Sequence, residues 1–357
     1  MKTVAIVGGT GAQGIPVIKA LTSDSAYAVR VLTRNPNSTS AKELAALPNV
    51  SIIEGNSYDE ATLIKTFTGA THVYVNPNGF AIGEKNELYW GIRMFEIAAQ
   101  VGVQHFIWSS SDAGYSASGY CEKYRAGHMD GSRRVHEWME SQKTGNQGLK
   151  MIWSALTSVP YLDMLNEMLA PHVEIDKGSG EETYVFQGPY GRVPWPLILL
   201  EDLGRYARWQ FDNPTLSSGQ NLRISTEDIS WADLAKTFTK VTGKKAVYRE
   251  QTVEEYFDAY PYGDPDAKVG HSVADDGTLL SFRTNFSGWY NTYNDGLVPR
   301  DYKMLDKVLP DRVKTVEEWM RKSKYNGEKL GVLKDFSAEG GIRGETKGRE
   351  KLPTQSN

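Results

Sequence analysis

The sequence contains a single cysteine, Cys121, among its 357 residues. An intrachain disulfide and a zinc site built from several cysteines are therefore excluded, and a reducing, intracellular location is the simplest expectation. Long hydrophobic runs are also missing, whereas a helix that spans a bilayer needs about 20 consecutive apolar residues. We therefore expect no membrane-spanning segment. The short apolar start runs directly into glycines without a cleavage-type region, so it predicts a first strand and not a signal peptide.

An excess of positive charge is missing too. Lys and Arg number 40 against 44 Asp and Glu, and the formal net charge is −4. This balance argues against a protein dedicated to binding nucleic acid, which usually carries a basic face. The six histidines show neither H-x-x-x-H nor H-E-x-x-H spacing, so we expect no metal site. A G-x-S-x-G elbow and a Walker lysine are absent as well.

Short β-rich apolar runs recur through the first half of the chain. Such runs are typical of strands buried on both faces of a parallel sheet. They occupy residues 3–7, 28–33, 50–53, 72–75, 104–108 and 151–156. Segments with helical spacing lie between them, for example 86–101 and 131–142. This alternation predicts right-handed βαβ units in a doubly wound parallel sheet of about six strands, which is an α/β Rossmann architecture.

The second half has a different composition, rich in Pro, Gly and aromatic residues over 157–225, with helical signals near 160–169 and 201–211. A clear helix is predicted over 231–242, because Ser230 can cap its start and Gly243 can end it.

Two capping boxes follow, and between them lies a segment without a helical signal. Thr252 with Glu255 predicts a helix over 253–259, and Thr315 with Glu318 predicts one over 316–323. Residues 260–280, rich in Asp, Gly and Pro, are expected to form a long loop.

We therefore expect two domains and a tail. Residues 1–156 would form a Rossmann domain, to which later segments such as 219–243 return. Residues 157–330 would form a second domain. Residues 337–357 hold almost no bulky apolar side chains and are expected to be a mobile tail.

The strongest local signal is a glycine-rich segment that follows the first strand and opens an apolar helix. It reads Gly8-Gly9-Thr10-Gly11-Ala12-Gln13-Gly14. Gly8 suits the tight turn, Gly11 lets backbone amides approach a diphosphate, and Gly14 lets the helix pack close to the sheet. Free amides at the helix N-terminus favour a negatively charged ligand. The alternative is a glycine-rich turn without a ligand, but the strand and helix around it favour dinucleotide binding.

The end of the second predicted strand bears on the choice of cofactor. An acidic residue there is typical of NAD, whereas this strand ends at Thr33 and Arg34. A guanidinium can bind the 2′-phosphate of NADP(H) through two hydrogen bonds, so NADP(H) is favoured and NAD(H) stays possible. The topology places Asn56 beside the adenine and Asn76-Pro77 beside the ribose.

Several segments together are similar to one known family. They are Gly8–Gly14, 33–36, 41–44, 54–56, 69–70, 98–103, 105–110, 201–204, 239–244 and 315–319. These segments resemble the NmrA-like group of atypical short-chain dehydrogenases/reductases, over about residues 2–323. The resemblance implies that residues 1–156 form an NAD(P)-binding Rossmann domain and that residues 157–330 form a smaller α/β substrate-binding domain. The family contains both reductases and catalytically silent dinucleotide sensors.

The catalytic residues that the wider superfamily would imply are incomplete. Its reductases use Tyr and Lys four residues apart, a spacing that is absent here, although Tyr120 and Lys123 could share a helix face. The family motif His-x-Asp-x-Lys is matched by His128 and Asp130, but Ser132 stands at the lysine position. His128 is a candidate proton donor. The alternatives are that Tyr120 and Lys123 are surface residues on a loop and that His128 belongs to a polar network.

Hydroxyl groups after the fifth and sixth strands complete the candidate site. Ser110 could bind a substrate carbonyl, and Ser111, Tyr115 and Tyr161 could contact the substrate. We expect an NADP(H)-dependent oxidoreductase that transfers hydride between NADPH and a small or medium apolar carbonyl, enone or imine. The alternative is a non-catalytic NAD(P) sensor that signals redox state through a regulatory protein partner. A cytoplasmic location is expected, with a nuclear one as well if the protein is regulatory.

Overall fold

The computed structural model describes residues 1–112, 114–142, 148, 150–260 and 263–330. The tail expected over 337–357 lies outside the described residues.

A parallel sheet of seven strands forms the larger part of the fold. Its order is β10-β6-β5-β4-β1-β2-β3. The strands are β1 (Lys2–Val7), β2 (Tyr27–Thr33), β3 (Val50–Glu54), β4 (His72–Val75), β5 (His105–Ser110), β6 (Ile152–Thr157) and β10 (Asn221–Arg223). The predicted Rossmann-type sheet is confirmed, and the expected six strands match β1 to β6. The seventh, β10, is an edge strand supplied from beyond residue 156.

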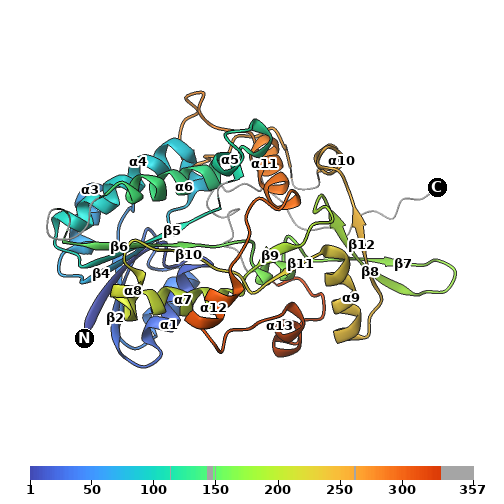
Figure 1. Ribbon diagram of the computed structural model, residues 1–357, viewed down its shortest axis with the longest axis horizontal. Coiled ribbons are helices and arrows are strands. Elements are labelled where there is room, and N and C mark those ends of the chain that lie inside the picture. The colour runs from blue at the N-terminus through green and yellow to red at the C-terminus, as the bar shows by residue number, and fades with distance from the viewer. Residues whose placement is uncertain (113, 143–147, 149, 261–262, 331–357) are drawn as a thin grey trace.

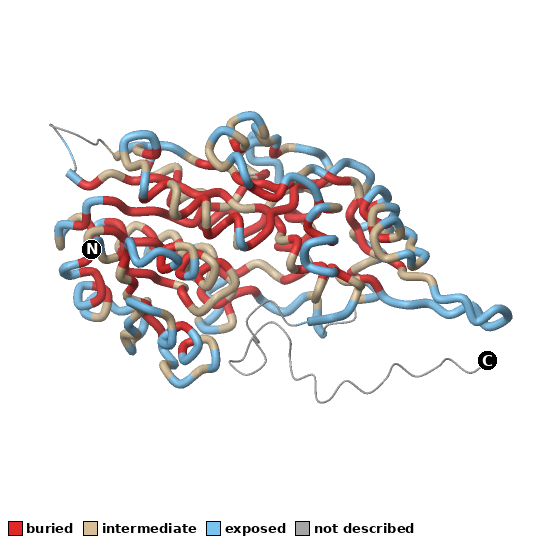
Figure 2. Tube along the Cα trace, turned by 90° about the horizontal axis from the view of Figure 1, so that it is seen from below, coloured by how far each residue is buried: buried red, intermediate tan, exposed pale blue. Residues whose placement is uncertain are grey.

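Helices cover both faces of this sheet (Figure 1). One face carries α4 (Gly79–Gln100) and α6 (Gly127–Glu140), and the other carries α1 (Gly14–Thr22) and α7 (Leu200–Asp212). Two further helices, α2 (Thr39–Ala45) and α3 (Glu60–Phe67), connect β2 to β3 and β3 to β4. Because both faces are covered, the neighbouring residues Val4 and Ala5, which point to opposite faces, are both fully buried. Figure 2 shows this buried layer running through the molecule.

The helices near the expected site start earlier than their apolar spacing predicts. α4 begins at Gly79, seven residues before the predicted start, and breaks at Gly83, whose φ of 72° is outside the helical region. The break tilts the first turn of α4 away from its amphipathic body, so the periodicity detects only the later part. α6 begins at Gly127 and spans residues 127–140, whereas the spacing predicts 131–142.

Segments from beyond residue 156 return to the large sheet. α7 packs on α1 so closely that a Cβ on Gly204 would lie 2.3 Å from the carbonyl oxygen of Pro16. The region 219–243 is divided between the two halves of the molecule. β10 joins the large sheet, whereas α9 (Trp231–Thr242) packs on the smaller sheet.

The smaller half is built on a three-stranded sheet of order β12-β8-β7. Its strands are β7 (His172–Ile175), β8 (Glu182–Gly188) and β12 (Ala246–Glu250). β7 and β8 form an antiparallel hairpin whose end is exposed at one extremity of the molecule (Figure 2). Ser230 caps α9 through the amide of Asp233, and Gly243 ends it with φ 72°, as predicted.

The remaining elements lie between and around these two sheets. They are β9 (Trp195–Leu197), β11 (Glu227–Ile229), α5 (Gly114–Ala117), α8 (Pro214–Ser217), α10 (Val253–Asp258), α11 (Phe282–Asn294), α12 (Tyr302–Val308) and α13 (Val316–Ser323), with 3-10 turns η1 (Glu122–Tyr124) and η2 (Leu162–Asn166). The helical signal over 160–169 corresponds only to η2. The helix α11 has no counterpart in the sequence predictions.

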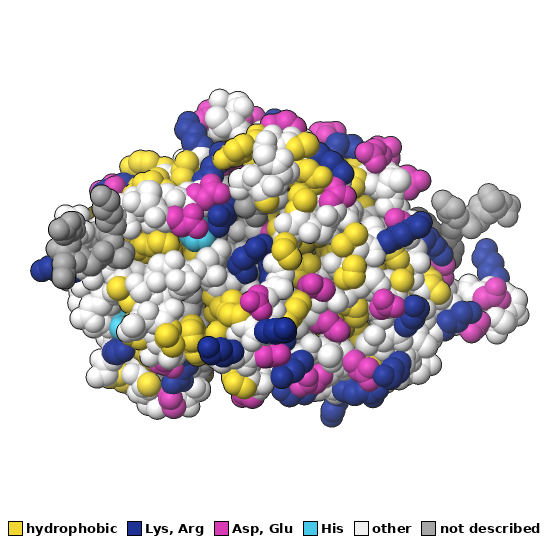
Figure 3. All heavy atoms as spheres, viewed as in Figure 1, with side chains coloured by type: hydrophobic (Ala, Val, Ile, Leu, Met, Phe, Trp, Pro, Cys, Tyr) yellow, Lys and Arg dark blue, Asp and Glu magenta, His cyan; other side chains and the backbone are white. Residues whose placement is uncertain are grey.

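The surface is consistent with the balanced composition. Figure 3 shows Lys and Arg interspersed with Asp and Glu on the face that is drawn. None of the helices in the described part of the chain combines the length and the apolar character needed to cross a membrane.

Candidate functional site

A cavity of about 800 Å³ opens at the carboxyl ends of the central strands. Parallel strands bring these ends to one edge, since Val7 of β1 lies between Leu32 of β2 and Val75 of β4. One part of the wall is the glycine-rich segment after β1, and another is a set of aromatic side chains from α10 and α11. This edge is the place where open α/β sheets bind ligands.

The glycine-rich segment forms a tight loop against β4. Gly8 has φ 79°, and a Cβ there would lie 2.1 Å from the Asn76 carbonyl oxygen. Gly14 is buried in the first turn of α1, where a Cβ would lie 2.3 Å from the Gly8 carbonyl oxygen. The roles predicted for these two glycines, a turn and close packing, fit this geometry.

The middle of the loop faces the cavity through Thr10, Gly11 and Ala12. Gly11 donates its amide to Gly8, but among the described residues the amides of Thr10 and Ala12 donate to no backbone carbonyl. Free amides beside a helix N-terminus suit a diphosphate. The residues present therefore fit a dinucleotide.

The side chain of Gln13 joins four neighbours at the bottom of the cavity. Its Nε2 donates to the Ser158 hydroxyl at 3.2 Å and to the Tyr161 hydroxyl at 2.8 Å. Its Oε1 accepts from Ser109 at 2.7 Å and from Tyr74 at 3.1 Å. Sequence reasoning assigned Gln13 to the cofactor through its backbone and missed this network. The network fixes the positions of hydroxyl groups that come from β5 and from the segment after β6.

Arg34 lies at the carboxyl end of β2 and lines the cavity, where the sequence placed it. Asn56 is exposed and its side chain accepts from the Tyr58 amide at 3.0 Å, which shapes the turn after β3. Ser57 and Tyr58, rather than Asn56, form the cavity wall there. Burial raises the pKa of Tyr58 to about 12, so its phenol is neutral.

Asn76 and Pro77 line the cavity after β4, and the first turn of α4 follows them. Glu87, one of the residues that sequence reasoning missed, lies beneath this turn. Its Oε2 is buried and has no hydrogen-bond partner among the described residues. Burial, with Glu84 nearby, raises the pKa of Glu87 well above 4.5. The cavity therefore has a carboxyl group in its wall that favours the protonated form.

The three serines at the end of β5, Ser109 to Ser111, do not share one face. Side chains alternate across a strand, so Ser109 and Ser111 line the cavity while Ser110 does not. Ser110 is 1% exposed, and its hydroxyl donates to the Ser111 carbonyl at 3.4 Å. Its position does not support the catalytic role that the sequence suggested.

Tyr115, Tyr120 and Lys123 lie outside the cavity wall. Tyr115 donates to Glu122, Tyr120 is 63% exposed, and Lys123 pairs with Asp295 at 2.5 Å. A shared helix face was the basis for pairing Tyr120 with Lys123. No helix spans the two residues, because Tyr120 lies between α5 and η1 with a φ of 66°. Their positions give no support to roles in catalysis or substrate binding.

His128 lines the cavity at the start of α6. Asn285 Oδ1 accepts from the His128 backbone amide at 3.1 Å and lies 3.0 Å from the ring Nδ1. The ring stacks on Phe80 at 4.7 Å and on Phe286 at 5.3 Å, and these two phenylalanines also stack on each other at 5.8 Å. Burial lowers the pKa of His128 to about 4, although the Asn285 contact opposes the shift. The ring is neutral at physiological pH, which does not support the predicted role as an imidazolium proton donor.

Ser132 lies where the family motif has lysine. It is buried, lines the cavity, and donates its hydroxyl to the Ser109 carbonyl at 2.9 Å. Asp130 is bound by Arg125 at 2.5 Å and by the Ala126 amide at 2.9 Å. Burial raises the pKa of Asp130 to about 6 against these contacts. Asp130 therefore holds the start of α6, and Ser132 brings no positive charge to the cavity.

The far wall is aromatic. Phe282, Phe286, Trp289, Tyr290 and Tyr293 of α11 line the cavity together with Tyr256 and Tyr260. The α11 residues follow one another at intervals of four, three, one and three, which is a helical stripe. This spacing is visible in the sequence and could have predicted both the helix and the wall. Tyr161, whose predicted place was this pocket, lines the cavity on the β6 side.

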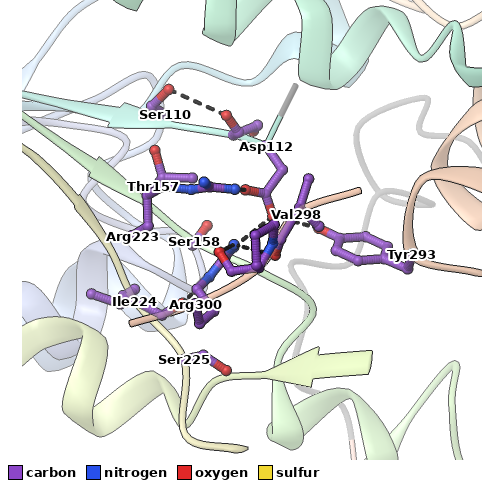
Figure 4. Close-up of polar contacts among 12 residues, drawn as sticks. Ser110, Asp112, Thr157, Ser158, Arg223, Ile224, Ser225, Tyr293, Val298 and Arg300 are labelled. Atoms are coloured by element: carbon purple, nitrogen blue, oxygen red, sulfur yellow. Dashed lines mark hydrogen bonds and ion pairs between the residues drawn. The ribbon is translucent and has the colours of Figure 1, made fainter. Parts of the chain in front are cut away.

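A buried ion-pair cluster fixes α11 to the large sheet (Figure 4). Asp112, just after β5, lies 2.6 Å from Arg300 and 3.1 Å from Arg223 of β10. The Tyr293 hydroxyl of α11 donates to the same carboxylate at 3.4 Å. The side chains of Asp112 and Arg300 are fully buried. The cluster thus connects the aromatic wall to the edge that carries the glycine loop.

The family model for the NmrA-like family matches residues 1–319 of this chain. The chain belongs to the NmrA-like family. A relative from Aspergillus hancockii, named an NmrA-like family domain-containing oxidoreductase, is 28% identical over 272 residues, which are 72% of this chain and 78% of the relative. The resemblance seen in the sequence is confirmed.

Two solved structures share this NmrA-like fold. NmrA, described as a negative transcriptional regulator in complex with NAD, has a TM-score of 0.68 and 18% identity, covering 90% of this chain and 94% of its own. An NADPH-dependent quinone oxidoreductase of Escherichia coli, complexed with NADPH, has a TM-score of 0.65 and 17% identity, covering 90% of this chain and 100% of its own. The first is named as a regulator and the second as a reductase.

Proposed function

We propose that this chain is an NADP(H)-dependent oxidoreductase that transfers hydride between the nicotinamide cofactor and a flat, apolar carbonyl, enone or imine. One observation carries the proposal: a single cavity joins the glycine-rich loop, Arg34 and a wall of aromatic side chains. When bound, the cofactor supplies the hydride chemistry. The named oxidoreductase among the relatives and the NADPH-bound neighbour support the same class.

The cofactor half of the cavity would be held by groups already in place. The free amides of Thr10 and Ala12 would bind the diphosphate. Arg34 would bind the 2′-phosphate, which is the basis for preferring NADP(H) to NAD(H). Asn76, Pro77 and Ser109 would lie along the rest of the cofactor, since they line the carboxyl edge of β4 and β5.

Tyr161 is the group that would polarise a substrate oxygen or nitrogen. Its hydroxyl oxygen accepts from Gln13, and its own hydrogen would be donated to a substrate in the cavity that Tyr161 lines. Burial raises the pKa of Tyr161, which keeps the phenol protonated. The aromatic wall of α11 would exclude water and stack on a planar substrate.

A second candidate function is a non-catalytic NAD(P) sensor with a protein partner. Ser132 favours it, because this buried hydroxyl is bound to Ser109 where the family motif has lysine. A regulator is also among the structural neighbours.

The enzyme and the sensor are distinguished by measuring NADPH oxidation in the presence of a panel of quinones, aromatic aldehydes and imines. Turnover that Tyr161→Phe slows by about 10²-fold or more, the range for a positioned proton donor, supports the enzyme. Micromolar binding of NADPH without turnover on any member of the panel decides for the sensor.

A further inference from the structure

The contacts of the His128 imidazole define which of its ring nitrogens carries the proton. The backbone amide of His128 can only donate, so the Asn285 atom that it contacts at 3.1 Å must be the oxygen. The same oxygen lies 3.0 Å from Nδ1. A carbonyl oxygen cannot donate a hydrogen bond, so Nδ1 carries the proton and Nε2 keeps its lone pair.

The Nε2 atom of the ring is accessible from the cavity. Phe80 and Phe286 stack on the ring at 4.7 and 5.3 Å and on each other at 5.8 Å, so the two phenylalanines do not enclose it from both sides. Asn285 occupies the Nδ1 edge. His128 lines the cavity and is only half-buried. Within the described residues Nε2 forms no hydrogen bond, and it is not a buried atom, so its lone pair is open to a ligand in the cavity.

We infer that His128 Nε2 is a fixed hydrogen-bond acceptor that selects aromatic substrates carrying an O–H or N–H group. The inference rests on the proposed function for its substrate class. The inference also predicts which member of a substrate–product pair binds more tightly. In an alcohol–carbonyl or amine–imine pair, the reduced member carries an O–H or N–H group that can donate to Nε2. A carbonyl oxygen would instead place its lone pair against the lone pair of Nε2. The reduced member therefore binds more tightly than the oxidised one.

The tautomer is tested without any substrate. In protein labelled with ¹⁵N-histidine, the resonances of His128 are assigned by their loss in His128→Phe. The expected spectrum shows a protonated Nδ1 and an unprotonated Nε2 at pH 7. A hydrogen on Nε2 overturns the inference.

Selection is tested by binding to the NADP⁺-loaded protein, with 2-naphthol and 2-methoxynaphthalene as probes. The probes have the same ring system, and only the first offers a hydrogen. We expect 2-naphthol to bind about three- to tenfold more tightly, the usual effect of one neutral hydrogen bond. His128→Phe keeps an aromatic ring against Phe80 and Phe286 and should make the two affinities equal.

Binding of both probes to the wild-type protein with one affinity, or binding of neither, overturns the selection. An unchanged preference in His128→Phe also overturns it, provided that the variant has the melting temperature of the wild type. These results can be distinguished from a failure of the proposed function. A sensor without turnover would still show the tautomer and the preference, whereas an enzyme that fails both tests would still oxidise NADPH.

Discussion

Replacing Glu87 by Gln should make the protein more stable at high pH and leave it nearly unchanged at low pH. Glu87 is 3% exposed, its Oε2 has no partner among the described residues, and burial raises its pKa well above 4.5. Above pH 4.5 the unfolded chain releases the proton of this carboxyl while the native state keeps it. The native state then binds more protons, so the free energy of unfolding falls as pH rises until the folded pKa is passed.

The size of the effect follows from the difference between the folded and the unfolded pKa. A tenfold difference between the two acid dissociation constants lowers stability at high pH by about 1.4 kcal/mol. Glutamine has nearly the same shape and does not titrate, so Glu87→Gln removes this loss. At pH 5 the variant exchanges a neutral acid for a neutral amide in the same surroundings, and we expect a small difference.

Urea unfolding at pH 5, 7 and 9 measures the effect. The difference between Glu87→Gln and the wild type should grow with pH and reach at least about 1.4 kcal/mol at pH 9, the value for a tenfold difference in acid dissociation constant. Glu43→Gln is the matched control, because Glu43 is exposed on α2 and should show no such trend. A difference that stays constant across the three pH values would refute the reasoning.

Three further predictions concern the glycine loop, the buried ion-pair cluster and the cofactor phosphate. Gly8→Ala should abolish NADPH binding in calorimetry, whereas Gly69→Ala, also at positive φ but with open space around its Cβ, should preserve it. Arg300→Met should lower the free energy of urea unfolding by about 3–5 kcal/mol, since it leaves a buried carboxylate without its main partner. Arg192→Met removes an exposed ion pair with Glu250 and should lower the free energy of unfolding by less than about 1 kcal/mol. Equal losses of stability in the Arg300 and Arg192 variants would contradict the account. Arg34→Ala should weaken NADP(H) binding by about 1.5–3 kcal/mol and leave NAD(H) nearly unchanged, and an equal loss for both would remove the 2′-phosphate assignment.

Structural elements are predicted correctly where the pattern of neighbouring residues alone determines them. Residues 4–7 and 72–75 of the predicted strands are buried on both faces, so the apolar composition of these runs identifies them as strands. Ser230 and Gly243 bound α9 through contacts within one helix, and each is readable from its neighbours. The glycine-rich loop is equally local, because its turn and its helix adjoin along the chain.

Other features depend on contacts that no local pattern carries. β8 pairs in parallel with β12, about 60 residues later, and Asp112 meets Arg300 across most of the chain. Which serine faces the cavity depends on where β5 ends, so the sequence suggests Ser110 although Ser109 and Ser111 line the wall. The pairing of Tyr120 with Lys123 assumes a continuous helix that the chain does not form.

Environment decides the chemistry of two cavity residues in a way that sequence cannot show. His128 is held by Asn285 and two phenylalanines, and these contacts make it an acceptor rather than an acid. Glu87 is surrounded by buried backbone at Gly79 and Gly131. The aromatic stripe of α11 is the exception, since its spacing is present in the sequence.

The central claim is that the loop from Gly8 to Gly14 binds the diphosphate of a nicotinamide dinucleotide. Isothermal titration of the folded, full-length protein with NADPH tests it most directly. The account predicts one binding site per chain with a dissociation constant in the micromolar range or below. The absence of heat with NADPH, NADP⁺, NADH and NAD⁺ alike would contradict it.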